Sequence, residues 1–386
     1  MEKMTLDEFA KIILEKIKEF LPDRYVDSDV RLQDITKNND TKLKAVTITV
    51  PDSNISPTIY LNNMYEQYQK GKPMEEILTQ IASIQAEHDR DVSIDITSIT
   101  AYDKVQGKIS ARLVNADNNQ ELLSQRPHTL VGNDLAVTYC VMLGENDNGS
   151  MSVPITNQLM ENYGVTVEEL HEAATQNMDE LTPASFKSMN EVMAEMMLPS
   201  LIAECGGDRE QAEQMLEAMM PPMEDGKMYV LTNEQKLNGA AIVLNDKVMD
   251  LVAEKVGGDF YILPSSVHEL LVIPRDAGME ISELEKMVCE VNATQVSVEE
   301  RLSDHVYAYD SQTHEIYRAD MEMEHTLAKE SGRDGKRNQL EKSTEKKEKL
   351  RESVKEKLVA KQKVVADVKK DAVTVAKNKN RATGIE

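Results

Sequence analysis

The sequence predicts an α+β protein with antiparallel or mixed sheets, helices packed on them, and a long basic C-terminal tail that is helical or disordered. Segments typical of strands occur in pairs with a helical segment between the pairs, which favours antiparallel neighbours over a doubly wound nucleotide fold. Apolar residues form 40% of the 386 residues, which is enough for a substantial core. Beyond residue 325 the chain has no proline and no aromatic residue, as expected of a solvated extension.

The first predicted part is an N-terminal α+β region over residues 1–155. It begins with a capping box, because Thr5 can cap a helix and Glu8 can reach back to its first turn. Apolar residues then recur at helical spacing until Pro22 marks the end. A turn at 37–40 separates the first two strands. The expected strands are 30–34, 43–50 and 58–61, and they are followed by expected helices at 62–70 and 74–88.

The second half of this region contains the expected central strand. Residues 99–124 have apolar spacing typical of helices. Residues 135–143 form an almost unbroken apolar run, as expected of a strand that is covered on both faces. After a turn, residues 150–155 are expected to return as a partner strand, and a domain boundary is placed near residue 155.

The second predicted part, residues 156–227, is helical and rich in methionine. Thr166 and Glu169 form another capping box. Nine of the 22 methionines lie between residues 189 and 228, in two short helices that Pro199, the pair Gly206-Gly207 and the pair Pro221-Pro222 would interrupt. Methionine fills irregular gaps in cores more often than it lines an adaptable docking groove, so a core role is favoured.

The third predicted part, residues 228–325, has the most regular pattern and is again α+β. Its helices are expected on one face of an antiparallel or mixed sheet. Gly257 is expected to end one of them in a left-handed cap. The strands are predicted at 228–232, 240–244, 260–263, 267–273, 306–309 and 315–318, and the helices at 246–256 and 281–291. The fourth part is the basic Lys/Glu-rich tail, residues 326–386.

The charge is distributed unevenly between tail and body. The tail holds 18 basic and 10 acidic residues, although the whole chain has a net charge of −24. Such an acidic body repels nucleic acid and anionic membranes, which favours solubility or a partner protein with a basic surface. Weak contact of the tail with nucleic acid or an acidic surface is the minor alternative. An N-terminus without an apolar signal segment, three dispersed cysteines and no long apolar run predict a cytoplasmic protein that does not enter membranes.

Common catalytic motifs are missing, so neither a cofactor nor a metal site is predicted. A zinc-binding H-E-x-x-H helix needs a second histidine four residues after the first. The three His-Glu pairs begin at His171, His268 and His314, and all three lack that second histidine. Phosphate-binding loops and nucleophile elbows are also absent from the sequence, and the glycine pairs follow helices instead of opening them.

The densest polar cluster next to predicted strands comprises Ser265, Ser266, His268 and Glu269. In extended geometry one of the two ionisable side chains faces apolar surroundings, where its pKa would be shifted. A serine nucleophile with His268 as its base is one interpretation. The favoured interpretation is a hairpin turn made by the serines, with His268 bonded to the backbone.

Three further residues are weaker candidates for a binding site. Asn233 and Asn238 flank a predicted loop and could orient a ligand, although asparagine is also common in turns. His128 follows a proline just before the central strand, where a structural turn is the favoured interpretation.

Several strings in the chain resemble an uncharacterised domain-of-unknown-function family of anaerobic Gram-positive bacteria. The resemblance covers roughly residues 1–320 and implies no assigned reaction, cofactor or partner. The tail lies outside it and is similar to Lys/Glu-rich ends of proteins from mobile genetic elements. The strings are RPHT at 126–129, VPIT at 153–156, SFKSM at 185–189, YVLTN at 229–233, NGAA at 238–241 and GDFYILPSSVHE at 258–269.

These observations leave three functional hypotheses. The leading one is a non-enzymatic intracellular interaction or regulatory protein. The alternative is a hydrolase or small-ligand-binding protein with a polar site around Ser266, His268 and Glu269, completed by Asn233 or Asn238. A third is an acidic mimic that binds a basic protein in place of another acidic molecule.

Overall fold

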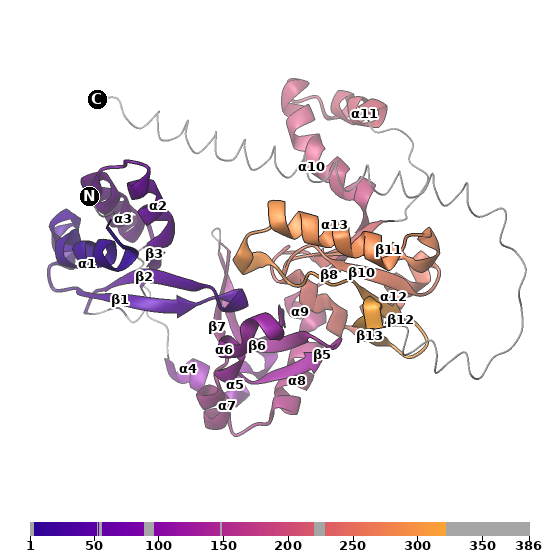
Figure 1. Ribbon diagram of the computed structural model, residues 1–386, viewed down its shortest axis with the longest axis horizontal. Helices are drawn as coiled ribbons and strands as arrows, with labels where there is room; N and C mark the ends of the chain where they lie inside the picture. Colours follow the sequence, from indigo (N-terminus) through magenta and orange to yellow (C-terminus); the bar gives the residue numbers. More distant parts are fainter. Residues whose placement is uncertain are drawn as a thin grey trace, which may run out of the picture. The chain divides into compact units, whose positions relative to one another are not determined.

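The computed structural model describes residues 4–51, 53, 56–88, 96–146, 149–219 and 228–321 (Figure 1). The predicted tail, residues 326–386, lies outside the described residues. The chain divides into two compact units, the first from residues 1–105 and 118–125, the second from residues 106–117 and from 126 onward. The boundary predicted near residue 155 falls inside the second unit. All strand pairs in the described part are antiparallel, and the α+β class is confirmed.

In the first unit three helices cover one face of a three-stranded sheet of order β1-β2-β3 (Figure 1). The predicted capping box is present: Thr5 Oγ1 accepts from the Glu8 N–H at 3.3 Å, and the Glu8 carboxylate accepts from the Thr5 N–H at 2.8 Å. Phe9 and Ile13 pack on Val46 in the core. The elements are α1 (Leu6–Lys16), β1 (Asp29–Thr36), β2 (Lys42–Thr49), β3 (Thr58–Tyr60), α2 (Asn62–Gln69), α3 (Met74–His88), α4 (Ile96–Thr100) and α5 (Tyr102–Val105).

A turn between β1 and β2 holds residues 118–125 in the first unit. Asp40 lies in this turn, and its carboxylate accepts from the N–H groups of Glu121 and Leu122 at 2.9 and 3.0 Å. These groups belong to the first turn of α6 (Gln120–Ser124), where helical N–H groups have no partner within the helix. The turn itself needs left-handed backbone at Asn39 and Asp40, which these residue types tolerate.

The second unit contains a four-stranded sheet in which β6 pairs with three other strands. The strands are β4 (Ile109–Asn115), β5 (His128–Val131), β6 (Leu135–Asn146) and β7 (Gly149–Pro154). The helix predicted over 99–124 is therefore wrong for 109–115. Nearly all of β4 is buried, so its apolar residues do not alternate, and the spacing of Ile109 and Leu113 fits a helix as well as a strand.

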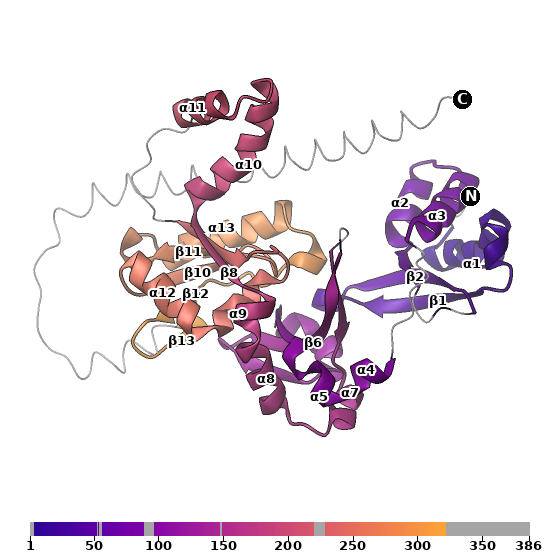
Figure 2. The same cartoon turned by 180° about the vertical axis from the view of Figure 1, so that it is seen from behind.

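Five helices and one strand follow. They are α7 (Asn157–Tyr163), α8 (Val167–Gln176), α9 (Met178–Leu181), β8 (Ala184–Ser188), α10 (Met189–Glu204) and α11 (Arg209–Met219). Helices α10 and α11 form a hairpin that projects from the end of β8 (Figure 2). Pro199 lies inside α10 and does not separate two helices as predicted. Met189 is buried in the core, whereas Met215 and Met219 are exposed. None of the described helices is both long enough and apolar enough to cross a lipid bilayer.

The second sheet of this unit has six strands in the order β13-β12-β10-β11-β9-β8. Its strands and long helices are β9 (Tyr229–Asn233), α12 (Asp246–Val256), β10 (Phe260–Pro264), β11 (Leu270–Pro274), α13 (Ile281–Thr294), β12 (Tyr307–Asp310) and β13 (Glu315–Arg318). Neighbouring residues of a strand point to opposite faces of the sheet. Val230 packs with α13, whereas Tyr229, the residue before it, contacts Lys255 of α12. The helices thus lie on both faces, and the prediction of a single covered face is wrong.

One predicted strand is a tight helix. Residues 240–244 belong to the 3₁₀ helix η6 (Gly239–Leu244), not to a strand. Asn238 has left-handed backbone, and Gly239 then lies directly against Thr232 of β9. Because the chain folds back over β9 at this point, it does not run on as a neighbouring strand.

Candidate functional site

The Ser265–Glu269 segment forms the turn between β10 and β11. Ser265 Oγ donates to Glu269 Oε1 at 3.2 Å, and the backbone N–H of His268 donates to Ser266 Oγ at 3.0 Å. These residues lie outside both strands, so the predicted alternation of their side chains between two sheet faces is wrong. The two serines hold a turn through local hydrogen bonds, as serine commonly does.

The ring of His268 connects this turn to the loop before η6. Its Nδ1 accepts from the backbone N–H of Asn238 at 3.0 Å, which places a ring proton on Nε2. That Nε2 lies 3.9 Å from Glu300 Oε1. The Asn233 side chain closes the same loop, donating to Leu237 O and accepting from Leu237 N–H. The His268 ring is therefore bonded through Nδ1 to the backbone of Asn238, whereas Ser266 contacts the backbone N–H of His268.

A pocket opens beside this loop, between the four-stranded sheet and η6. Its empty space is about 480 Å³ and includes part of the solvent at its mouth. Asn233 and Asn238 line it, whereas the four residues of the Ser265–Glu269 cluster do not. The other polar or ionisable lining residues are Ser110, Arg112, Cys140, Thr182 and Gln235.

Strand register places several polar side chains on one face of the four-stranded sheet. Paired residues share a face, and Arg112, Thr138 and His128 are paired across β4, β6 and β5. Ser110 and Cys140 are paired in the same way two residues further along. The opposite face is covered by α8, whose His171 bonds to the Tyr139 hydroxyl at 3.1 Å. The polar face is thus the one that opens to the pocket.

Arg112 lies on this polar face, and Arg126, which precedes β5, lies near it. Arg112 donates to Ser152 Oγ at 2.5 Å, and Arg126 is half-buried beside it. Burial, and then the charge of Arg112, lower the pKa of Arg126. Arginine nevertheless stays protonated at neutral pH, so two like charges remain close together. Within the described ranges, neither guanidinium forms an ion pair with a carboxylate.

The remaining ionisable groups on this face are Cys140 and His128. Burial raises the pKa of the Cys140 thiol, although both arginines oppose this shift, and the thiol donates to Ser110 O at 3.7 Å. A thiol in this state is a poor nucleophile. His128 Nδ1 donates to the carbonyl of Arg126 at 3.0 Å. This contact uses one ring nitrogen, and the other, Nε2, is the one that could contact a ligand.

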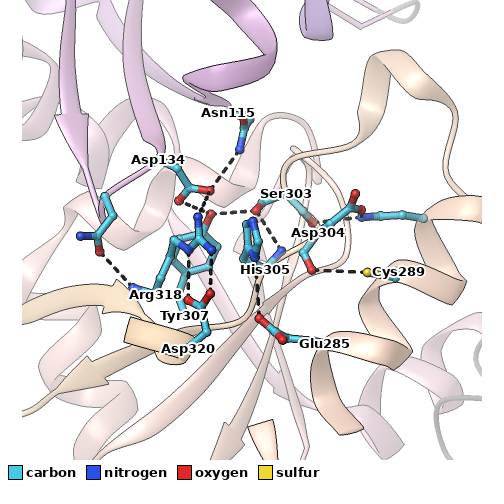
Figure 3. Close-up of polar contacts among 12 residues, drawn as sticks. Asn115, Asp134, Glu285, Cys289, Ser303, Asp304, His305, Tyr307, Arg318 and Asp320 are labelled. Carbon is cyan, nitrogen blue, oxygen red and sulfur yellow. Dashed lines mark hydrogen bonds and ion pairs between the residues drawn. The ribbon is translucent and has the colours of Figure 1, made fainter. Parts of the chain in front are cut away.

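A second polar cluster surrounds Tyr307 of β12 (Figure 3). The Tyr307 hydroxyl donates to the buried Asp134 at 2.8 Å and is hydrogen-bonded to Ser303 Oγ at 2.8 Å. Burial, and then the charge of Asp134, raise the pKa of Tyr307. Arg318 lies between two carboxylates, binding Asp320 through Nε and a terminal nitrogen at 3.1 and 2.7 Å and lying 3.8 Å from Asp134.

Three potential metal ligands meet at the edge of this cluster. Glu285, His305 and Asp320 each offer one ligand atom, and these atoms lie within 4.8 Å of one another. His305 Nδ1 is 3.6 Å from Glu285 Oε1. Figure 3 shows the His305 ring directed toward Glu285 of α13.

Comparison with protein families gives one match. The family model of DUF5688, a family of unknown function, matches residues 6–311. The chain belongs to this family. The resemblance to an uncharacterised family is thereby confirmed, and DUF5688 membership assigns no activity. No curated protein and no solved structure matches the chain.

Within this DUF5688 chain the sequence identified part of the pocket and missed its charged residues. Asn233 and Asn238 line the pocket, and His128 lies on the same sheet face as Arg112. Arg112 was missed, although an arginine within the apolar segment 109–114 was a usable signal. Glu285 lies on α13, His305 in the loop before β12 and Asp320 in the 3₁₀ turn after β13, so no local motif could have joined them.

Proposed function

We propose that the protein is a non-enzymatic binding protein that holds a small anionic molecule, through a phosphate or carboxylate group, in the pocket at Arg112. One observation carries this proposal: Arg112 lines the pocket, Arg126 is near enough for the charge of Arg112 to lower its pKa, and neither guanidinium has a carboxylate partner among the described residues. A cytoplasmic location and a basic protein partner, both expected from the sequence, stay predictions.

An anion would relieve the electrostatic cost of this arrangement. Two guanidinium groups close together repel each other, and half-burial weakens the screening by water. Neither guanidinium can remove this repulsion by losing its proton, because arginine stays protonated at neutral pH. Arginine binds phosphate and carboxylate through paired N–H groups, and such charge-assisted bonds are about twice as strong as neutral ones.

The wider charge of the protein makes this local positive site distinctive. A chain with a net charge of −24 repels anions over most of its surface, so an anionic ligand needs a local cationic group to bind. Ser110, Ser152 and Asn238 lie beside Arg112 and supply neutral polar groups. The pocket therefore suits a small anion, not an extended cofactor.

A binding role fits the local chemistry better than catalysis does. A serine nucleophile needs its hydroxyl at the lone pair of a base, whereas His268 Nδ1 accepts from Asn238 N–H and Ser266 Oγ accepts from the backbone. The Cys140 thiol has its pKa raised by burial. These features support binding without turnover.

Calorimetric titration with phosphate and with citrate, at constant ionic strength, tests this function. We expect binding to the full chain and a loss of roughly tenfold or more in affinity in Arg112→Met, equivalent to about 1.4 kcal/mol or more. The matched control is Arg209→Met, because Arg209 is exposed on α11 and paired with Glu213. Equal affinity of Arg112→Met and wild type, or no binding of either anion at millimolar concentration, would contradict the proposal.

A further inference from the structure

We propose that Glu285, His305 and Asp320 form a binding site for a divalent transition-metal ion of the zinc class. This inference is independent of the anion pocket, because no residue is shared between the two. The three ligand atoms lie within 4.8 Å of one another, and an imidazole nitrogen with two carboxylate oxygens is a common ligand set for such ions.

The backbone around the three ligands is held in place by burial and hydrogen bonds. Glu285 lies on α13 directly after Leu284, which is fully buried in the core. The N–H of His305 donates to Ser303 Oγ at 3.1 Å. The N–H of Ala319, next to Asp320, donates to the carbonyl of Val306, next to His305, at 2.9 Å. The backbone positions of the three ligands are therefore fixed. Rotation of the side chains would bring their ligand atoms to an ion.

Charge balance also favours a cation here. Two carboxylates of this cluster, those of Asp134 and Asp320, lie at the guanidinium of Arg318, whereas the carboxylate of Glu285 lies 3.6 Å from His305. Arg318 is shared between Asp134 and Asp320, so it cannot also neutralise Glu285. A divalent ion between Glu285 and Asp320 would offset this excess of negative charge.

The ion pair with Arg318 is compatible with metal binding by Asp320. Arg318 donates one N–H to each carboxylate oxygen, and each oxygen has a second lone pair. Hydrogen bonds from neighbouring residues to a metal-binding carboxylate fix its orientation in known metal sites, and Arg318 would do this for Asp320. The imidazole ligand selects zinc-class ions, because Mg²⁺ and Ca²⁺ prefer oxygen ligands only.

Titration of the metal-free full chain with Zn²⁺, and separately with Mg²⁺, tests the site. We expect Zn²⁺ to bind and His305→Ala to weaken the affinity by roughly tenfold or more, because one of three ligands is lost. The matched control is His314→Ala, since His314 is an exposed histidine paired with one carboxylate, Asp250. Equal Zn²⁺ affinity in wild type and His305→Ala, or the same loss in His314→Ala, would overturn the proposal.

A second variant keeps the test valid if His305→Ala disturbs folding. Glu285→Gln keeps the shape of the side chain on the surface of α13 and removes the charge of the ligand. We expect it to weaken Zn²⁺ binding while its circular dichroism spectrum in metal-free buffer matches that of the wild type. Unchanged Zn²⁺ affinity in this variant, or Mg²⁺ binding as tight as Zn²⁺ binding, would likewise overturn the assignment.

Discussion

Replacing Gly239 by alanine is expected to destabilise the protein by about 3 kcal/mol, the largest effect we predict for a single methyl group. A Cβ at this position would lie 2.5 Å from His268 O and 2.7 Å from Asn233 N, and closer still to Thr232 Oγ1. Two of these three atoms are backbone, so no side-chain rotation relieves the clash. The loop between β9 and η6 would have to move, together with the wall of the pocket that it forms.

Denaturant unfolding followed by circular dichroism measures this effect. Gly107→Ala is the matched control, because an added Cβ there meets no atom within 4 Å. We expect that control to change stability by no more than a few tenths of a kcal/mol, or to raise it slightly through the unfolded state. A Gly239→Ala variant as stable as Gly107→Ala would show that the loop is not packed as described.

Replacing Tyr307 by phenylalanine is expected to cost about 2–3 kcal/mol. The hydroxyl makes the shortest hydrogen bond to the buried carboxylate of Asp134, whose other contacts, to Asn115 and Arg318, are longer at 3.4 and 3.8 Å. Without this hydroxyl, the buried carboxylate of Asp134 loses its shortest hydrogen bond. The loss of a hydrogen bond to a buried charge costs more stability than the loss of one between neutral groups.

Tyr139→Phe is the matched control for this experiment. Both tyrosines have about 1% of their surface exposed, but the Tyr139 hydroxyl bonds to the neutral side chains of Thr129 and His171. We expect its removal to cost about 1 kcal/mol in the same unfolding measurement. If Tyr307→Phe costs no more than Tyr139→Phe, the carboxylate of Asp134 does not depend on Tyr307.

Elements with local end signals could be predicted from the sequence. The capping boxes that begin at Thr5 and Thr166 both form, and α12 ends at Gly257 in left-handed backbone as expected. Each of these signals depends on residues within one or two turns of chain. Residues 109–115 were misassigned because their strand is buried on both faces, and residues 240–244 because the contact of Gly239 with Thr232 decided their structure.

The candidate sites show the same limit of local reasoning. Ser266 and His268 were selected as candidates because they are close together in the sequence. The structure places both in a turn. Arg112 is placed next to His128 and Thr138 by the register of β4, β6 and β5, and Arg126 lies just before β5. Such a pairing depends on strand order, which a single sequence does not specify.

The central claim is that the two guanidinium groups hold an anion, and anomalous diffraction tests it most directly. Selenate has the shape and charge of sulfate and scatters anomalously at the selenium edge. For crystals of the full chain grown with selenate, we predict an anomalous peak in the pocket, within hydrogen-bonding distance of Arg112. Selenate bound at other sites with no peak beside Arg112 would contradict the account.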